Sequence, residues 1–464
     1  MKINASLQSL FCAVVLGVNQ SNGFLASVSI VRRQMITLNA HGPQENGGVF
    51  GFQDRPLLKK FGQDIHRRVM DSAQGRHRKG KIGAYTSKEI IPRLDMQCST
   101  AAYGLNDLSI ASRQEIREAF SESENTFNSR LHGRSSGSGC VIIRLQGEDA
   151  VAMHKLVNYA DRFFDQVDSI EGKEVADVGV FRVANHVYVG FDENVNDGKM
   201  QFLDTRIFSG TEGGGHNAML LPIELQKLMG SASMNDAHNG MNTLFDIGSQ
   251  ITSAVLRMPS KSANKLIDDG TSVDDTTRVL ANKVSNSYHR LIRYLKPDEN
   301  ATGAAFEPHV DSSFLTMIPM PKLPGLEIWC PSRSTTDDGS REWGEWVQPT
   351  LQADEQLNDG NAYIIVMAGH FLELTSDGKV PTCIHRVIPP SNKNTGMYQP
   401  RISGPLFLRP RIGEDALLDV DNDLKLESDK SSTEPMTNGL YHEKGLLDEC
   451  DKMHLWSAHD VIKS

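Results

Sequence analysis

The sequence of 464 residues carries a formal net charge of −10, and at about 150 residues per domain it allows roughly three domains or one large domain with insertions. An acidic chain of this kind has no general attraction for nucleic acid or anionic lipid. Its six cysteines include no Cys-x-x-Cys motif, which argues against a disulfide scaffold, a thiolate zinc site and a redox dithiol. Composition therefore argues against a dedicated nucleic-acid-binding protein and against cysteine chemistry.

Residues 1–44 are expected to form a targeting presequence rather than part of the fold. The apolar run at residues 10–18 is too short to span a membrane but has the length of a signal-peptide hydrophobic region. No acidic residue occurs before Glu45, and the stretch after Phe24 contains Arg32 and Arg33. This composition resembles the two-part plastid presequence of algae with complex plastids. We expect entry into the secretory route or a plastid, with no membrane span in the mature chain. A disordered tail on a cytoplasmic protein is the alternative.

Residues 45–98 are rich in Gly, Gln, Arg and Lys and have no sustained period of 3.6 or 2, which predicts a mostly irregular linker. Residues 99–280 are expected to form an N-terminal region of helices and strands. Apolar positions at helical spacing predict two amphipathic helices there, one capped by Asp149 and one over residues 244–258. Strands are predicted at residues 141–145 and 178–191, and residues 229–240 are predicted to be loop-like.

Residues 281–410 are the candidate core, because short β-like segments alternate there with turn signals such as Asp359-Gly360. Such punctuation is typical of a β-sandwich or jelly roll. The expected fold class is therefore mainly β with flanking helices, around a double-stranded β-helix (jelly roll) core. Residues 285–295 fit a helix or a strand, and the acidic residues 411–464 are expected to form a tail. The β-like segments are residues 314–318, 326–329, 362–368, 371–374, 383–387 and 401–408.

Within this region, Glu-Pro-His309-Val-Asp311 offers an imidazole and a carboxylate, and side chains at i and i+2 of a strand share one face. With fifteen histidines and 58 acidic residues, about 1.9 such matches are expected by chance, so the pattern alone is weak. His385 in a later segment is a candidate third ligand. Two His and one carboxylate leave three positions of an octahedral ion open. This suits Fe(II) that binds a chelating cosubstrate and dioxygen, whereas structural zinc would be closed by a fourth ligand.

Arg401 and Ser403 lie on one face of the last predicted β-like segment. A guanidinium and a hydroxyl together match a carboxylate. We expect this pair to bind the distal carboxylate of a dicarboxylate whose 2-oxo acid end chelates the metal, as 2-oxoglutarate would. A structural salt bridge of Arg401 is the alternative.

These motifs follow one another in an order that resembles one enzyme family. The sequence reads His309-Val-Asp311-Ser-Ser-Phe-Leu-Thr, then Gly325-Leu-Glu-Ile, then Leu374-Thr-Ser-Asp-Gly378, then His385-Arg-Val-Ile-Pro-Pro and Arg401-Ile-Ser403. It resembles the iron(II)/2-oxoglutarate-dependent dioxygenases of the isopenicillin-N-synthase-like group, closely over residues 288–410 and loosely over residues 139–206.

The resemblance implies an oxidoreductase that oxidises a small-molecule substrate, most simply by hydroxylation, and releases succinate and CO2. The cofactors implied are Fe(II), 2-oxoglutarate and O2, with ascorbate as a reductant. By position, the implied metal ligands and catalytic residues are His309, Asp311 and His385, and the implied cosubstrate-binding residues are Arg401, Ser403 and Tyr294.

The sequence departs from the family pattern in three places. Ile292 stands where the family often has Asn, a polar insert occupies residues 333–345, and the stretch from His385 to Arg401 is long. Two alternatives stay open: a relative that uses dioxygen without 2-oxoglutarate, and a non-catalytic jelly-roll protein that binds a small molecule or a partner. Retention of Asp311 argues against a halogenase of this fold, which would need that position free for halide.

Overall fold

The structure is a computed structural model. The expected presequence, most of the expected linker, nearly all of the 333–345 insert and the acidic tail lie outside the residues that it describes. Within the described part, no helix is long and apolar enough to cross a membrane. The described residues are 65, 67–70, 72, 91–96, 110–120, 138–169, 180–184, 187–195, 200–208, 218–257, 267, 284–295, 306–330, 344–351, 360–376, 380–388 and 400–409.

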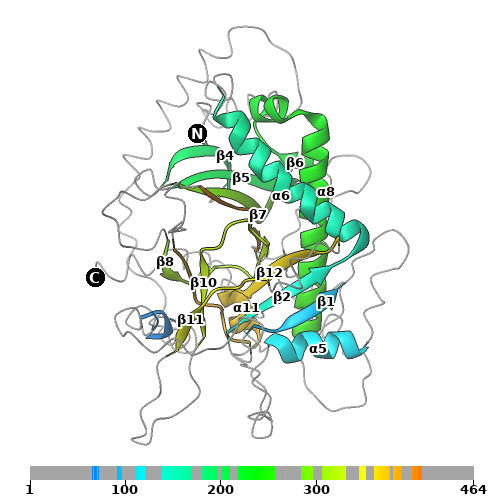
Figure 1. Cartoon of the computed structure of the whole chain (residues 1–464), viewed down its shortest axis with the longest axis vertical. Coiled ribbons are helices and arrows are strands. Elements are labelled where there is room, and N and C mark those ends of the chain that lie inside the picture. Colours follow the sequence, from blue (N-terminus) through cyan, green and yellow to red (C-terminus); the bar gives the residue numbers. More distant parts are fainter. Residues whose placement is uncertain are drawn as a thin grey trace, which may run out of the picture. The chain divides into compact units, whose positions relative to one another are not determined.

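Two sheets make up the core (Figure 1). The larger sheet has central strands in the order β12-β9-β15-β7, and the smaller sheet has the order β11-β10-β13-β8. The bounds of these strands and of β14, which pairs with β7, are β7 Val284–Tyr294, β8 Phe306–His309, β9 Leu315–Pro319, β10 Leu326–Cys330, β11 Glu345–Val347, β12 Ala362–Ala368, β13 His385–Val387, β14 Arg401–Ser403 and β15 Leu406–Leu408.

The chain crosses repeatedly between the two sheets. β7 belongs to the larger sheet, β8 to the smaller, β9 to the larger, β10 and β11 to the smaller, β12 to the larger, β13 to the smaller, and β14 and β15 to the larger. The pairs among these strands are antiparallel. Two sheets built by such alternation define a double-stranded β-helix, so the expected fold class is confirmed. The ambiguous residues 285–295 lie in the strand β7 except for the last.

Burial on both faces explains why the central strands have continuous apolar runs. All seven residues of β12 are buried, because one face meets the smaller sheet and the other lies against α6. A cluster of buried residues joins the two sheets, and it includes Ile142, Ile365, Leu326 and Ile328. The predicted strand 362–368 coincides with β12, since a short apolar run between turn signals is typical of a fully buried strand.

Additional strands extend the larger sheet on both sides, and one of them, β1, lies within the expected linker. β1 pairs in parallel with β2, and Asp95 accepts two hydrogen bonds from Arg144 across the pair. β1 was not predicted individually, because four residues are too few for a period to stand out in the sequence. The added strands are β1 Arg93–Met96, β2 Cys140–Leu145, β3 Val180–Ala184, β4 Val187–Val195, β5 Met200–Phe208 and β6 Ala218–Leu220.

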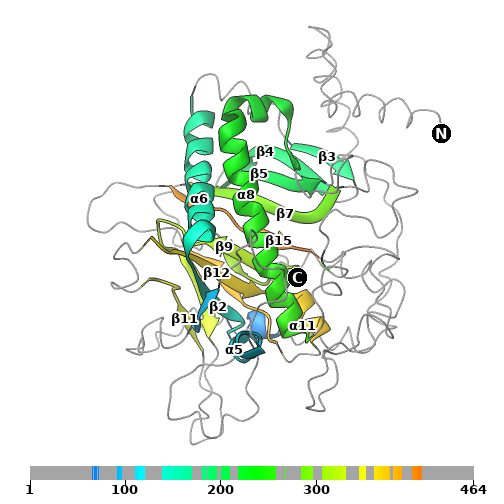
Figure 2. The same cartoon turned by 90° about the vertical axis from the view of Figure 1, so that its right-hand side faces the viewer.

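Two helices, α6 Gly147–Val167 and α8 Ile223–Val255, run side by side along the larger sheet (Figure 2). The prediction of a loop at residues 229–240 is wrong, because α8 covers this stretch with a kink at Gly230, where φ is 73°. Small residues hide the helical pattern: a Cβ on Gly240 would lie 2.6 Å from the Cβ of Leu156, so the two helices approach closely there. Asp149 is not the cap of α6; it lies in the first turn, after Gln146 at the N-cap.

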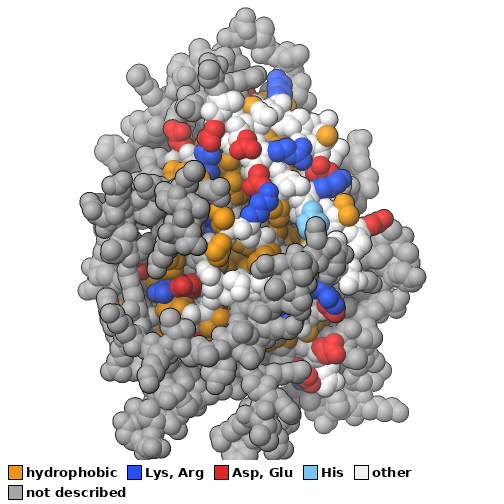
Figure 3. Space-filling view, viewed as in Figure 1, with side chains coloured by type: hydrophobic (Ala, Val, Ile, Leu, Met, Phe, Trp, Pro, Cys, Tyr) orange, Lys and Arg blue, Asp and Glu red, His pale blue; other side chains and the backbone are white. Residues whose placement is uncertain are grey.

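The helix α11, His370–Thr375, replaces the strand predicted at residues 371–374. Phe371 and Leu372 are buried, and a short apolar run of this kind does not distinguish a buried helical turn from a buried strand. The structure also contains the strand β11 and the helix α5 Ile110–Phe120, which were not predicted. The view in Figure 3 shows hydrophobic side chains in a hollow of the described surface, with charged side chains beside it.

Candidate metal centre

The two sheet strands β8 and β13 bring the three predicted metal ligands together. His309 ends β8, His385 begins β13, and the two residues are directly paired across the smaller sheet. Asp311 follows two residues after the end of β8, so it lies in the connection to β9 rather than in a strand as predicted. One ligand atom from each of the three side chains lies within 4.8 Å of the others, and the rings of the two histidines are 4.2 Å apart between centroids.

The histidine tautomers follow from their backbone contacts. Nδ1 of His309 lies 2.7 Å from the carbonyl oxygen of Glu307, and Nδ1 of His385 lies 3.2 Å from that of Cys383. Because a carbonyl oxygen can only accept, each Nδ1 carries the hydrogen, which leaves the lone pair of a neutral ring on Nε2. Burial, with a smaller effect of His385, lowers the pKa of His309 to about 3, so this ring is neutral at neutral pH.

Both Nε2 atoms face the carboxylate of Asp311. The distances are 3.7 Å from His309 Nε2 to Oδ1 and 3.6 Å from His385 Nε2 to Oδ2, which is too long for a hydrogen bond. Thr316 donates a hydrogen bond of 2.6 Å to Oδ2 and thereby orients the carboxylate, and Ser313 lies 3.0 Å from the same hydroxyl. Three donor groups thus converge. Adjacent ligand atoms that each lie about 2.1 Å from one ion are about 3 Å apart. The two His–Asp distances exceed this spacing by less than about 1 Å, so a small movement would let all three side chains bind one ion.

The predicted cosubstrate residues lie on the larger sheet. Arg401 and Ser403 of β14 pair with Tyr294 and Ile292 of β7. Arg401 is 1% exposed, and its Nε and Nη1 atoms have no hydrogen-bond partner among the described residues. Its guanidinium lies 5.1 Å from the centre of the Tyr294 ring, and burial lowers the pKa of Arg401 while Tyr294 raises it.

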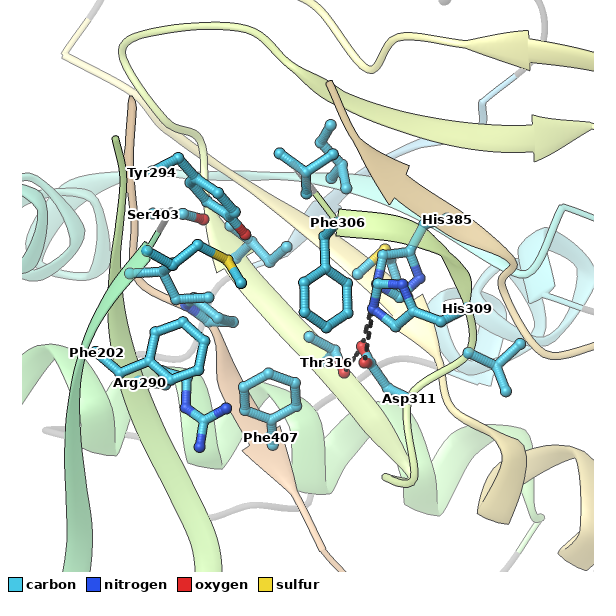
Figure 4. A pocket seen from close by; sticks show the side chains of 18 of the residues that line it. Phe202, Arg290, Tyr294, Phe306, His309, Asp311, Thr316, His385, Ser403 and Phe407 are labelled. Carbon is cyan, nitrogen blue, oxygen red and sulfur yellow. Dashed lines mark hydrogen bonds and ion pairs between the residues drawn. The ribbon is translucent and has the colours of Figure 1, made fainter. Parts of the chain in front are cut away.

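One cavity of about 230 Å³ connects these residues. In Figure 4, His309, His385 and Asp311 lie together on one side, and Tyr294 and Ser403 lie across from them. Arg401 also lines this cavity. The ring of Phe306 packs edge-on against His309 at 4.3 Å between centroids. The structure therefore brings all six residues named from the sequence to a single cavity.

Several lining residues were not predicted from the sequence. Phe202 comes from β5, Arg290 from β7 and Phe407 from β15, and Arg290 forms two hydrogen bonds of 2.6 Å with Asp204 of β5. The alternation of Met200, Phe202, Asp204 and Arg206 along β5 was a usable signal, since alternate residues of a strand share a face. It does not reveal the pairing of β5 with β7, which joins segments about 86 residues apart.

No protein-family model and no curated protein matches the sequence. Solved structures do match. The dioxygenase for auxin oxidation 1 from Arabidopsis thaliana, in a binary complex with 2-oxoglutarate, is 16% identical, with 72% of this chain and 95% of that chain covered and a TM-score of 0.42. A full-length protein from Neurospora crassa, in complex with alpha-KG (2-oxoglutarate), is 15% identical, with coverage of 80% and 100% and a TM-score of 0.45.

The dioxygenase for auxin oxidation from rice is 15% identical, with 71% of this chain and 88% of that chain covered and a TM-score of 0.38. The Arabidopsis and rice proteins are dioxygenases by name, and the Arabidopsis and Neurospora structures are complexes with 2-oxoglutarate. At such identities and TM-scores, neither their reactions nor their substrates transfer to this chain.

Proposed function

We propose that the chain is an Fe(II)/2-oxoglutarate-dependent dioxygenase that hydroxylates a small-molecule substrate. One observation carries the proposal: the triad and the partly unpartnered guanidinium of Arg401 line the same cavity. A metal-binding set and a receptor for a carboxylate, placed in one cavity, match a ligand that chelates the metal at one end and carries a carboxylate at the other. 2-Oxoglutarate has both groups.

The donor set supports Fe(II). Two neutral imidazoles and one carboxylate form the facial set of non-haem Fe(II) oxygenases, in which the remaining positions are open. Among the described residues, no fourth His, Cys, Asp or Glu joins His309, Asp311 and His385. A structural zinc site would be completed by such a fourth ligand.

Arg401 supports the dicarboxylate. A buried cation without a carboxylate partner is unfavourable, and an ion pair with a ligand offsets this cost. Its Nε and Nη1 atoms retain donors to offer, and a planar guanidinium is the side-chain group that best matches the two oxygens of a carboxylate. The hydroxyl of Ser403, two residues along the same strand face, adds a further donor.

Each part of the site has a distinct role. When bound, iron and 2-oxoglutarate supply the oxidising chemistry, in which one atom of O2 enters the substrate and the other enters succinate as CO2 leaves. Glu307 and Cys383 hold the histidine rings through their carbonyl oxygens, and Thr316 holds the carboxylate of Asp311. Apolar residues such as Phe306 and Leu326 line the cavity and disfavour the entry of water.

Succinate formation tests the proposal against a non-catalytic jelly-roll binder. The full-length protein is incubated with Fe(II), 2-oxoglutarate, ascorbate and O2, and succinate is measured. We expect succinate from the wild type and from Arg144→Gln, an exposed β2 variant outside the cavity, and none from His385→Ala. Absence of succinate from iron-loaded wild-type protein, or equal formation by a folded His385→Ala variant, would contradict the proposal.

A further inference from the structure

We infer that the substrate is a planar aromatic or conjugated carboxylate, and that Arg290 binds its carboxylate beside the rings of Phe202, Tyr288 and Phe407. The inference rests on the proposed function, because it names the substrate class of the same cavity. It concerns the aromatic end of the cavity, defined by these four residues, and not the end formed by Arg401.

The strand register builds this aromatic end. Across β5 and β7, Phe202 pairs with Ile292, Asp204 with Arg290, and Arg206 with Tyr288. On the other side of β7, Phe407 of β15 pairs with Tyr288. Because alternate residues of a strand share a face, these side chains stand on the face that carries Tyr294 and Arg401. The aromatic end is therefore continuous with the proposed cosubstrate end.

Aromatic rings form the walls of the aromatic end of the cavity. Tyr288 and Phe407 are stacked with 4.6 Å between centroids and 21° between planes. The guanidinium of Arg290 lies 4.3 Å from the centre of the Phe202 ring and 5.1 Å from that of Tyr288. In Figure 4, Phe202, Arg290 and Phe407 are gathered on the side of the cavity away from His385. Flat aromatic walls favour a ligand with a flat body, which can stack on them or meet them edge-to-face.

Arg290 supplies the polar contact. Its two bonds to Asp204 use Nε and Nη2, so Nη1 lies outside that pair, and 26% of the side chain is exposed although it lines the cavity. Burial disfavours its charge, but Asp204 together with Tyr288 and Tyr294 outweighs the effect of burial and raises the pKa of Arg290. Arg290 is thus a fixed cation that is held in place by Asp204 and still has a donor to offer.

The neighbouring charge favours an anion over a neutral acceptor. Arg206 lies over the Tyr288 ring at 4.5 Å and is 3% exposed. Burial lowers the pKa of Arg206 to about 10, against the opposing effect of Asp204, so Arg206 stays cationic at neutral pH. Asp204 stabilises the positive charges of both Arg206 and Arg290, and the positive charge of Arg409 also acts on Arg206. An incoming carboxylate is attracted to the cationic side chain of Arg290 that lines this end of the cavity.

Three small molecules of similar size test separately whether the cavity prefers a negative charge and whether it prefers a flat ring. Phenylacetate is planar at the ring and anionic, phenylacetamide is its neutral counterpart, and cyclohexylacetate is anionic without a flat ring. Dissociation constants are measured by calorimetry on the full-length protein loaded with Zn(II) and 2-oxoglutarate, which requires no turnover. We expect phenylacetate to bind at least about tenfold more tightly than either of the other probes, since a hydrogen bond to a charged group is worth about 1.5–3 kcal/mol. Equal binding of phenylacetate and phenylacetamide would overturn the inference.

Substitutions at the pair Arg290 and Asp204 assign the preference to these residues. The readout is the preference ratio, defined as the dissociation constant of phenylacetamide divided by that of phenylacetate. Asp204→Asn keeps one acceptor oxygen that can hold Arg290 and removes the competing negative charge, so we expect the ratio to rise. Arg290→Gln should lower the ratio to about one, because the charge-assisted bond is lost. Arg144→Gln, which removes an arginine with a similar two-bond contact to Asp95 on β2, should leave the ratio unchanged.

A double variant controls for a loss of folding in Arg290→Gln. Arg290→Gln leaves Asp204 without this partner at 7% exposure, so the double variant Asp204→Asn/Arg290→Gln, which has no charge at the pair, is measured as well. A ratio of about one in the double variant supports the inference, and a wild-type ratio overturns it. If succinate never forms but the wild-type ratio and its loss are observed, the proposed function fails alone. If succinate forms and the ratio is about one in the wild type, this inference fails alone.

Discussion

Replacing Arg401 by Gln separates a ligand-binding arginine from a structural one. The side chain is 1% exposed, and no described carboxylate pairs with it. In the absence of ligand, Arg401→Gln therefore removes a desolvated cation instead of breaking an ion pair. Loss of one partner from a buried ion pair costs about 3–5 kcal/mol, whereas we expect the free energy of unfolding of Arg401→Gln to stay within about 1 kcal/mol of the wild type.

Affinity for 2-oxoglutarate should respond in the opposite way. A charge-assisted hydrogen bond contributes about 1.5–3 kcal/mol, which corresponds to a weakening of at least about tenfold on substitution. Calorimetric titration of 2-oxoglutarate into the metal-loaded protein measures this, and urea unfolding measures stability. The matched control is Arg293→Gln, because Arg293 donates to Asp168 and Gln201. This control should retain affinity for 2-oxoglutarate, and any loss of stability comes from the contacts of Arg293 with Gln201 and with the ring of Phe164, because Asp168 is largely exposed.

Two results would refute the reasoning on Arg401. One is an affinity of Arg401→Gln for 2-oxoglutarate equal to that of the wild type. The other is a loss of stability of about 3–5 kcal/mol, the cost of removing one partner of a buried ion pair, which would mean that Arg401 is a structural residue.

Three further predictions concern other parts of the chain. Thr316→Val removes the hydroxyl that donates to Asp311, and we expect metal affinity, measured by competition with a chelator, to fall about 10–100-fold; an unchanged affinity would count against this role. Burial lowers the pKa of His289 to about 4. The unfolded chain therefore binds a proton that the folded chain does not between about pH 6.5 and 4, and stability is lost as the pH falls through this window. His289→Gln should flatten this loss in urea titrations, and an identical pH profile would contradict the assignment. We propose that residues 1–44 direct a fluorescent fusion to the secretory route or a plastid of an algal cell; purely cytosolic fluorescence would dismiss this proposal.

The core strands could be predicted from the sequence more accurately than the helices. Residues 362–368 could be recognised as a strand because burial on both faces leaves a continuous apolar run bounded by turn signals. The helix at residues 229–240 escaped notice because Gly240 and other small residues permit close helix contact without large apolar side chains. Residues 371–374, which lie in the helix α11, were predicted to be a strand, because four residues are too few to show a period.

The residues of the site also differ in how far the sequence predicts them. His309 and Asp311 are close in sequence, and His385 and Arg401 occur in motifs whose order can be recognised, so the sequence is sufficient to name them. Arg290 has no local motif. Its place in the cavity depends on the register of β7 with β5, which long-range pairing determines and a reading of local patterns does not provide.

The most direct test of the metal centre is an anaerobic titration of the protein with Fe(II) and then with 2-oxoglutarate, followed by absorbance. We expect one iron per chain and a charge-transfer band when 2-oxoglutarate is added to the wild type. The band should be absent from His385→Ala, and Arg401→Gln should need at least about tenfold more 2-oxoglutarate to produce it. Wild-type iron affinity in a folded His385→Ala protein would contradict the assignment of His309, Asp311 and His385 as the metal ligands.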